Sequence, residues 1–160
     1  MYDLGPDLDD EVPPGTNILV SGPPLTGKRS LCLDILASGT EAGEGAIIVT
    51  TKDSADRVLT DFGKRISYED RPVAVIDCVT KQQGVGDIRD DERIKYASSP
   101  VDMTGIGIKL SEVLQSFYQG QGITENRVMV HSLSTLLMYA DLQTVFRFLH
   151  VFTGRIQSVN

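Results

Sequence analysis

The sequence contains no apolar run of the roughly 18 residues that a transmembrane helix requires. Its first 15 residues, MYDLGPDLDDEVPPG, are acidic and polar, and they lack the basic and apolar regions of a secretory signal. We therefore expect a protein that does not associate with a membrane and that resides in the cytoplasm.

Positive charge and cysteine are also scarce. The chain has 15 Lys and Arg residues against 22 Asp and Glu, a net charge of −7. Because a nucleic acid backbone is bound mainly by clustered positive charge, this balance makes nucleic-acid binding an unfavoured function. The two cysteines, Cys32 and Cys78, lack metal-site spacing and lie in apolar stretches, so we expect reduced core residues.

What the sequence does contain is an alternation of apolar runs and amphipathic stretches. The runs predict strands at 17–22, 45–51, 72–79 and 127–133, and the amphipathic stretches predict helices at 27–39, 54–65, 104–120 and 141–157. Strands alternating with helices form right-handed βαβ units. We therefore expect an α/β fold with a mostly parallel, twisted sheet that has helices on both faces, within a single domain spanning 1–160.

Local signals add detail to these elements. Gly39 is a plausible stop for the first helix, Ser54 is a good N-cap for the second, and Thr104 or Ser111 is expected to cap the third. The predicted inner faces comprise Leu31, Ile35 and Leu36 in the first helix, Val58, Leu59 and Phe62 in the second, and Leu142, Val145, Phe146, Leu149 and Phe152 in the last. The polar segment 80–103 is predicted to be a long loop of the kind that is often functional. Because the last helix would normally lead to another strand, we expect that the chain is truncated at its C-terminus or that a partner chain completes the sheet.

The segment SGPPLTGKRS, residues 21–30, has the spacing of a phosphate-binding loop between a strand and a helix. In such a loop, successive backbone N–H groups form an anion-binding nest, which the positive end of the helix strengthens. Gly22 and Gly27 permit the tight path, and Lys28 would reach the β- and γ-phosphates. The predicted nucleotide-binding residues are Gly22, Pro23, Pro24, Leu25, Thr26, Gly27, Lys28, Arg29 and Ser30.

Arg29 departs from this pattern, which has Ser or Thr after the lysine to place a hydroxyl on Mg²⁺. An arginine cannot ligate a cation, because it has no acceptor and carries a fixed positive charge. Ser30 is one residue further on and points about 100° away around the helix. Arg29 therefore either projects outward into solvent, which we favour, or approaches the phosphates and partly replaces the charge of the metal.

Three segments, residues 15–36, 45–59 and 127–137, together resemble the RecA-like ATPases of the KaiC and archaeal recombinase-paralogue group. The sequence is particularly similar to the degenerate KaiC-like proteins of halophilic archaea, which are implicated in signal transduction. The resemblance spans roughly residues 1–160, the N-terminal two-thirds of such a domain. It implies a RecA-like P-loop core that binds ATP or ADP and that assembles into homo-oligomers.

The resemblance also implies where ATP hydrolysis is impaired. Members that hydrolyse ATP carry acidic residues after the second strand and an aspartate at the end of the fourth strand. This chain has Lys52 and Asp53 at the first place and His131 at the second, so the Walker A and Walker B positions are both altered. Asp53 is the candidate catalytic residue, although its side chain is one methylene shorter than glutamate. His131 brings no negative charge to hold Mg²⁺, which leaves Asp77 as a candidate metal ligand and makes a bound Mg²⁺ doubtful.

Three functions follow from these observations. The first is a degenerate RecA- or KaiC-like domain that acts in signal transduction or regulation by binding a nucleotide or a partner protein. The second is a slow, Mg²⁺-dependent ATPase that uses Lys28, Asp53 and Asp77. The third is a recombinase accessory protein that binds DNA, which the acidic balance opposes. The altered positions favour the first function, because each of them removes a group that binds metal or assists catalysis.

Overall fold

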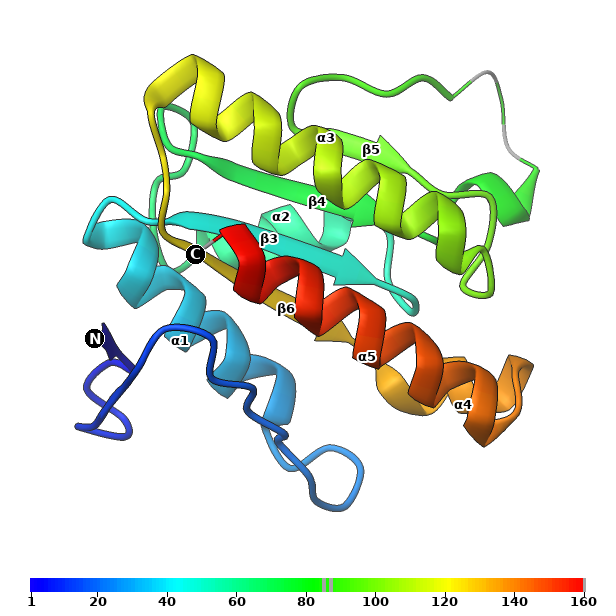
Figure 1. Cartoon of the computed structure of the whole chain (residues 1–160), viewed down its shortest axis with the longest axis horizontal. Coiled ribbons are helices and arrows are strands. Elements are labelled where there is room, and N and C mark those ends of the chain that lie inside the picture. Colours follow the sequence, from blue (N-terminus) through cyan, green and yellow to red (C-terminus); the bar gives the residue numbers. More distant parts are fainter. Residues whose placement is uncertain (85, 87, 160) are drawn as a thin grey trace.

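The computed structural model describes residues 1–84, 86 and 88–159, and it has a four-stranded, all-parallel sheet at its centre (Figure 1). Residues 85, 87 and 160, which belong to the predicted loop and the predicted domain, lie outside the described residues. The strand order is β5-β4-β3-β6. The strands are β3 (Gly45–Thr50), β4 (Val73–Asp77), β5 (Ile94–Tyr96) and β6 (Asn126–His131), with a separate antiparallel pair, β1 (Tyr2–Asp3) and β2 (Glu11–Val12). The helices are α1 (Lys28–Glu41), α2 (Ala55–Gly63), α3 (Met103–Gln121), α4 (Leu133–Tyr139) and α5 (Leu142–Val159), and a short 3-10 helix, η1, spans Lys81–Gln83.

Helices cover both faces of the sheet, which confirms the predicted α/β class (Figure 1). On one face, α1 and α2 pack against alternate strand residues such as Ile48 and Val75. On the other face, α3 and α5 pack against Ile47 and Ile76. The inner strands β3 and β4 are buried along their whole length, as expected for parallel strands with helices on both sides.

The strand predicted at 17–22 is not formed, which corrects that expectation. The segment has no regular secondary structure, and its side chains Ile18 and Leu19 are 49% and 76% exposed. In the described part of the chain, β6 pairs only with β3, so no strand adjoins its other edge. The apolar run shows a preference for burial, but strand pairing also requires a partner edge in the right register.

The long loop predicted at 80–103 contains regular structure. Residues 94–96 form β5, which pairs in parallel with β4 from Val75↔Ile94 to Asp77↔Tyr96. The pairing is supported at the start of β5, where the Asp91 carboxylate accepts hydrogen bonds from the backbone N–H groups of Arg93 and Ile94. A three-residue strand carries too little periodicity to be recognised in a polar sequence, which explains why it was not predicted.

Several helix details differ from the predictions. Helix α1 continues through Gly39 to Glu41, because Gly39 lets the helix pass close to the side chain of Arg127 on β6. The N-cap of α3 is Asp102, whose carboxylate accepts a hydrogen bond from the Gly105 N–H, and neither Thr104 nor Ser111 has that role.

The inner faces were predicted correctly in part. In α2, Val58, Leu59 and Phe62 are all buried. In α5, Val145 and Phe152 are buried, whereas Leu142 and Phe146 are 74% and 68% exposed. The inner side instead includes the half-buried Phe148, which packs against Phe152 with their ring centroids 5.2 Å apart. The helix is therefore rotated relative to the apolar stripe that the sequence indicates.

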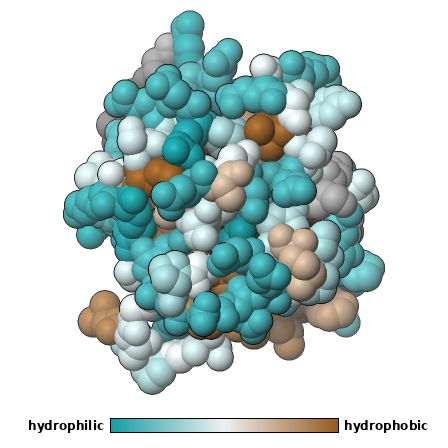
Figure 2. Space-filling model, turned by 90° about the vertical axis from the view of Figure 1, so that its left-hand side faces the viewer, coloured by the Kyte–Doolittle hydropathy of each residue, from teal (hydrophilic) through white to brown (hydrophobic). Residues whose placement is uncertain are grey.

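Both cysteines are free, and Cys78 is buried in the core next to β4. Burial raises the pKa of the Cys78 thiol to about 12, so this side chain behaves as a small apolar residue. The molecular surface at the left of Figure 1 is mostly hydrophilic, with small and separate apolar areas (Figure 2). In the part of the chain that is described, no helix has the length and hydrophobicity needed to span a bilayer.

Candidate functional site

The candidate site lies where the strands β3 and β6 end and the helix α1 begins. Because parallel strands place their carboxyl ends at one edge of a sheet, ligands of open α/β folds commonly bind there. Hydrogen bonds join the chain segments at this edge. The Thr51 N–H donates to the His131 carbonyl at 2.5 Å, and the Thr51 hydroxyl donates to the Ser132 carbonyl at 2.8 Å. The residues that follow β3 are thus held beside the end of β6.

The phosphate-type loop precedes α1 as the sequence predicts, and it is open to solvent. Gly27 is the N-cap of α1 with φ near 90°, a conformation that favours glycine, and Leu25 also has a positive φ of 60°. No side chain caps α1, and its first turn contains no acidic residue. The Lys28 Nζ donates hydrogen bonds to the carbonyls of Gly22 and Pro23, both at 2.7 Å. The loop therefore presents an uncapped helix terminus next to an ammonium group, which is a suitable environment for an anion.

Arg29 is turned toward α2, and it neither projects into solvent nor points at the loop. Its Nη1 forms a hydrogen-bonded ion pair with Asp61 of α2, and its Nε lies 3.6 Å from the Asp53 carboxylate. The hydrogen bond from Arg29 holds the pKa of Asp61 below its usual value. The favoured interpretation of Arg29 as an outward, solvated residue is therefore wrong, because two carboxylates near the first turn of α1 attract its guanidinium.

Asp53 and His131 are brought together at this edge. The His131 Nε2 lies 3.1 Å from the Asp53 Oδ2, and both side chains are largely buried. A neutral imidazole that carries its proton on Nε2 can donate this hydrogen bond to the carboxylate. Asp53 thus interacts with His131 and Arg29 at once, while Lys52 is exposed beside them. A carboxylate with these two partners is a poor ligand for Mg²⁺, because the fixed guanidinium charge already neutralises it.

The environment of His131 predicts a specific pH dependence. Burial lowers the pKa of His131, and this effect outweighs the Asp53 contact, which raises the pKa. A lowered pKa in the folded state means that His131 contributes its full stability above about pH 6.5 and loses it as the pH falls through the folded-state pKa. Urea unfolding of the wild type should therefore show decreasing stability between about pH 7 and pH 5, and His131→Gln should show a flatter profile.

The same prediction can be checked directly by NMR. Titration of the His131 ring resonances should give a midpoint below about 6.5, the value of an unperturbed histidine. A midpoint for His131 above about 6.5 would contradict the prediction, because it would mean that Asp53 stabilises the imidazolium more than burial destabilises it.

Asp77 lies at the end of β4, but its oxygens are committed to the protein. Its Oδ1 accepts hydrogen bonds from the N–H groups of Val79 and Thr80, and its Oδ2 accepts from the Ala55 N–H at the start of α2. The Thr80 hydroxyl also donates to Oδ2. The side chain of Ser54 does not cap α2, and Asp77 at the end of β4 supplies the missing acceptor. Asp53 and Asp77, the acidic residues at this edge of the sheet, therefore do not fit Mg²⁺ well, because both are already bound by donors of the chain.

Helix α2 and the residues just before it also contribute to this site, which was not predicted from the sequence. Asp53, Arg57 and Asp61 follow one another at intervals of four residues, and the Arg57 Nη1 lies 3.8 Å from the Asp53 Oδ1. Arg57 and Asp61 lie on one face of α2, and Asp53 precedes the helix, so the alternation of charges was visible in the sequence. Its relation to Arg29 was not, because 32 positions separate Arg29 from Asp61.

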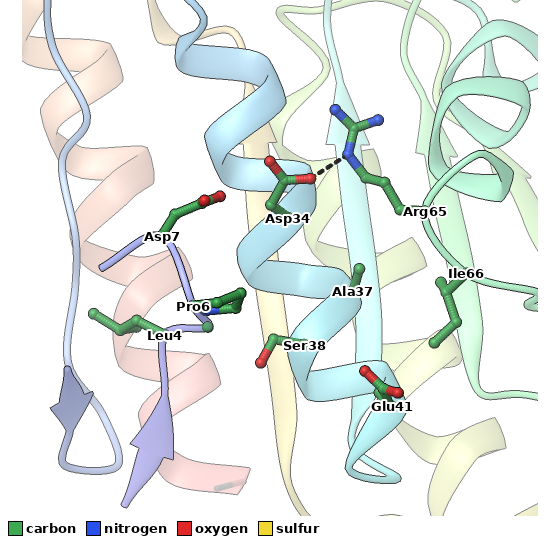
Figure 3. Close-up of a pocket in the computed structure, with 10 residues that line it drawn as sticks. Leu4, Pro6, Asp7, Asp34, Ala37, Ser38, Glu41, Arg65 and Ile66 are labelled. Atoms are coloured by element: carbon green, nitrogen blue, oxygen red, sulfur yellow. Dashed lines mark hydrogen bonds and ion pairs between the residues drawn. The ribbon is translucent and has the colours of Figure 1, made fainter. Parts of the chain in front are cut away.

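A separate pocket of about 410 Å³ lies between the N-terminal segment, α1 and the residues after α2 (Figure 3). Arg65 borders it and donates a hydrogen bond from Nε to Asp34 at 2.6 Å. The same guanidinium also donates to the Ser30 hydroxyl and to the Asp61 carbonyl. None of the residues 22–30 lines this pocket, so it is distinct from the phosphate-type loop.

The fold and the site together define an α/β protein with a parallel sheet and an open, loop-bounded site at the carboxyl ends of its strands. The chain belongs to DUF7504, a family of unknown function that matches residues 15–160. The match begins after β1 and β2 and includes the whole site. Comparisons with curated proteins and with solved structures found no match.

Proposed function

We propose that this protein is a regulatory domain that binds a nucleotide such as ATP or ADP at residues 22–30 without requiring Mg²⁺. The observation that carries the proposal is the position of Arg29. A fixed positive charge stands next to the anion-binding loop and pairs with Asp53, the residue proposed to assist hydrolysis. The uncapped start of α1 and the nearby Lys28 ammonium would hold the phosphates. The site thus supports binding and opposes metal-assisted hydrolysis.

The resemblance to the RecA-like ATPases of the KaiC group supports this proposal, and the parallel sheet with helices on both faces is compatible with it. In this interpretation the domain acts in signal transduction through a protein partner and can assemble with copies of itself. DNA binding as a recombinase accessory protein is not favoured, because the chain has a net charge of −7.

The test is calorimetric titration of ATP and ADP into the wild type, with Mg²⁺ and with EDTA. We expect similar affinities in both conditions, and Lys28→Ala should weaken binding about tenfold to a hundredfold, since a hydrogen bond to a charged group contributes about 1.5–3 kcal/mol. Lys52→Ala is the matched control, because it removes the same charge from an exposed residue at the same sheet edge. It should change the affinity far less.

Two outcomes would contradict the proposal. Binding that requires Mg²⁺, together with phosphate release that Lys28→Ala abolishes, would establish the slow ATPase instead. The absence of binding in every condition would mean that the loop retains its sequence pattern without a nucleotide.

A further inference from the structure

Arg29 connects the start of α1 to two different parts of the chain. Its guanidinium pairs with Asp61 in the last turn of α2 and with Asp53 in the segment that follows β3. The third nitrogen of this group, Nη2, is buried and has no hydrogen-bond partner among the described residues. A guanidinium normally uses several of its five N–H donors when it is enclosed. The present arrangement therefore leaves part of the binding capacity of Arg29 unused.

Both carboxylates that hold Arg29 have a second positively charged or hydrogen-bonding partner. The Lys64 Nζ lies 3.4 Å from the Asp61 Oδ1. The Arg57 Nη1 lies 3.8 Å from the Asp53 Oδ1, and the His131 Nε2 lies 3.1 Å from its Oδ2. If Arg29 moved away, neither carboxylate would be left alone. The departure of Arg29 would therefore cost much less than the loss of an isolated ion pair.

The contact between α1 and α2 does not depend on Arg29 alone. Arg65, which follows α2, donates a hydrogen bond to Asp34 of α1 (Figure 3). It also donates one to Ser30 of the same helix. These bonds lie within about one and a half turns of Arg29 along α1. The two helices would consequently stay together if Arg29 changed partners, while the segment from Asp53 to Asp61 would lose a restraint.

A phosphate bound at the loop would compete for Arg29. The backbone of Arg29 belongs to the first turn of α1 and directly follows Lys28, so its side chain starts next to the proposed phosphate position. A planar guanidinium can bind phosphate oxygens through two parallel hydrogen bonds, whereas Arg29 meets each of its two carboxylates through a single nitrogen.

We propose that Arg29 exchanges its partners when a nucleotide binds, so that its guanidinium moves away from Asp53 and Asp61 and binds the phosphates. This exchange transmits the occupancy of the loop to α2. This inference rests on the proposed function, and it assigns Arg29 the role of the regulatory residue of that site. Asp61 competes with the nucleotide for Arg29, so it keeps the affinity of the resting protein low. The region that changes on binding extends from Asp53 to Arg65.

The first test compares ATP affinities by calorimetry in EDTA. Asp61→Asn should bind ATP at least threefold more tightly than the wild type, because the competitor for Arg29 is weakened. Asp34→Asn is the matched control, since it removes the same charge from a carboxylate that pairs with Arg65 instead of Arg29. Arg29→Gln should bind more weakly, and Asp61→Asn should have no further effect when it is introduced into Arg29→Gln.

The second test follows α2 directly by hydrogen exchange with mass spectrometry. Addition of ATP in EDTA should change the exchange of peptides that cover residues 53–65 in the wild type but not in Arg29→Gln. Arg29→Lys keeps the charge but not the fork of donors, so its ATP-dependent change in hydrogen exchange should be intermediate. Thermal unfolding of each variant shows whether it is folded.

The outcomes separate this inference from the proposed function. Equal gains in ATP affinity in Asp61→Asn and Asp34→Asn would overturn the exchange, because they would show that removing any nearby negative charge strengthens the binding of the anion. ATP binding that depends on Lys28 but is unaffected by changes at Arg29 and Asp61 would also overturn it, while the proposed function would stand. If the wild type binds no ATP, both proposals fail.

Discussion

Replacement of Arg127 by alanine is expected to destabilise the fold by about 3–5 kcal/mol, the range measured when one partner of a buried ion pair is removed. Arg127 lies on β6 and forms a two-point ion pair with Glu44, and the two side chains are only 9% and 10% exposed. Its Nη1 also donates to the carbonyls of Asp3 and Ile35, at 2.6 and 2.9 Å. The variant leaves the Glu44 carboxylate buried without its cation and leaves two carbonyls without their donor.

Urea unfolding of the single and double variants measures this effect. Arg127→Met combined with Glu44→Leu should be less destabilised than Arg127→Ala, since no charge remains uncompensated in the interior. A cost below about 1 kcal/mol for Arg127→Ala would contradict the prediction, because it would place this pair among the weak ion pairs of protein surfaces.

Replacement of Asp77 by alanine should cost about 3 kcal/mol or more, since each buried donor left without an acceptor costs about 1–3 kcal/mol. The carboxylate of Asp77 is 1% exposed and accepts from three backbone N–H groups and one hydroxyl. These bonds tie the end of β4 to the start of α2 and to the turn that begins at Val79. The loss should therefore affect α2 first, which hydrogen exchange can detect alongside urea unfolding.

Asp77→Asn separates the acceptor role from a metal-binding role. The amide keeps the shape and one acceptor oxygen, so an intermediate loss of stability is expected. Addition of Mg²⁺ should leave the unfolding midpoint of the wild type unchanged, because the Asp77 oxygens are occupied by donors from the chain. A rise of the midpoint with Mg²⁺ that disappears in Asp77→Asn would instead assign a metal to this position.

The local elements of this fold could be predicted because their signals lie within short stretches of sequence. The strands β3 and β4 are continuous apolar runs bounded by polar or turn residues, and α2 has Val58, Leu59 and Phe62 at helical spacing. The segment 17–22 has a similar apolar signal but remains outside the sheet, while β5 has a weak signal and joins it. A sequence pattern indicates which secondary structure a segment prefers, whereas strand pairing depends on which edge of the sheet the segment can reach.

The features of the candidate site likewise divide into those that the sequence predicts and those that depend on the tertiary structure. The sequence by itself determined the spacing of the loop, the position of Lys28 at the start of α1 and the presence of Arg29 where the phosphate-loop pattern has Ser or Thr, because these features are contiguous. Only the tertiary structure decided that Arg29 pairs with Asp53 and Asp61, that His131 meets Asp53, and that Asp77 caps α2. Charged side chains choose partners by distance in space and by burial, and the sheet and its helices bring together residues that the chain keeps far apart.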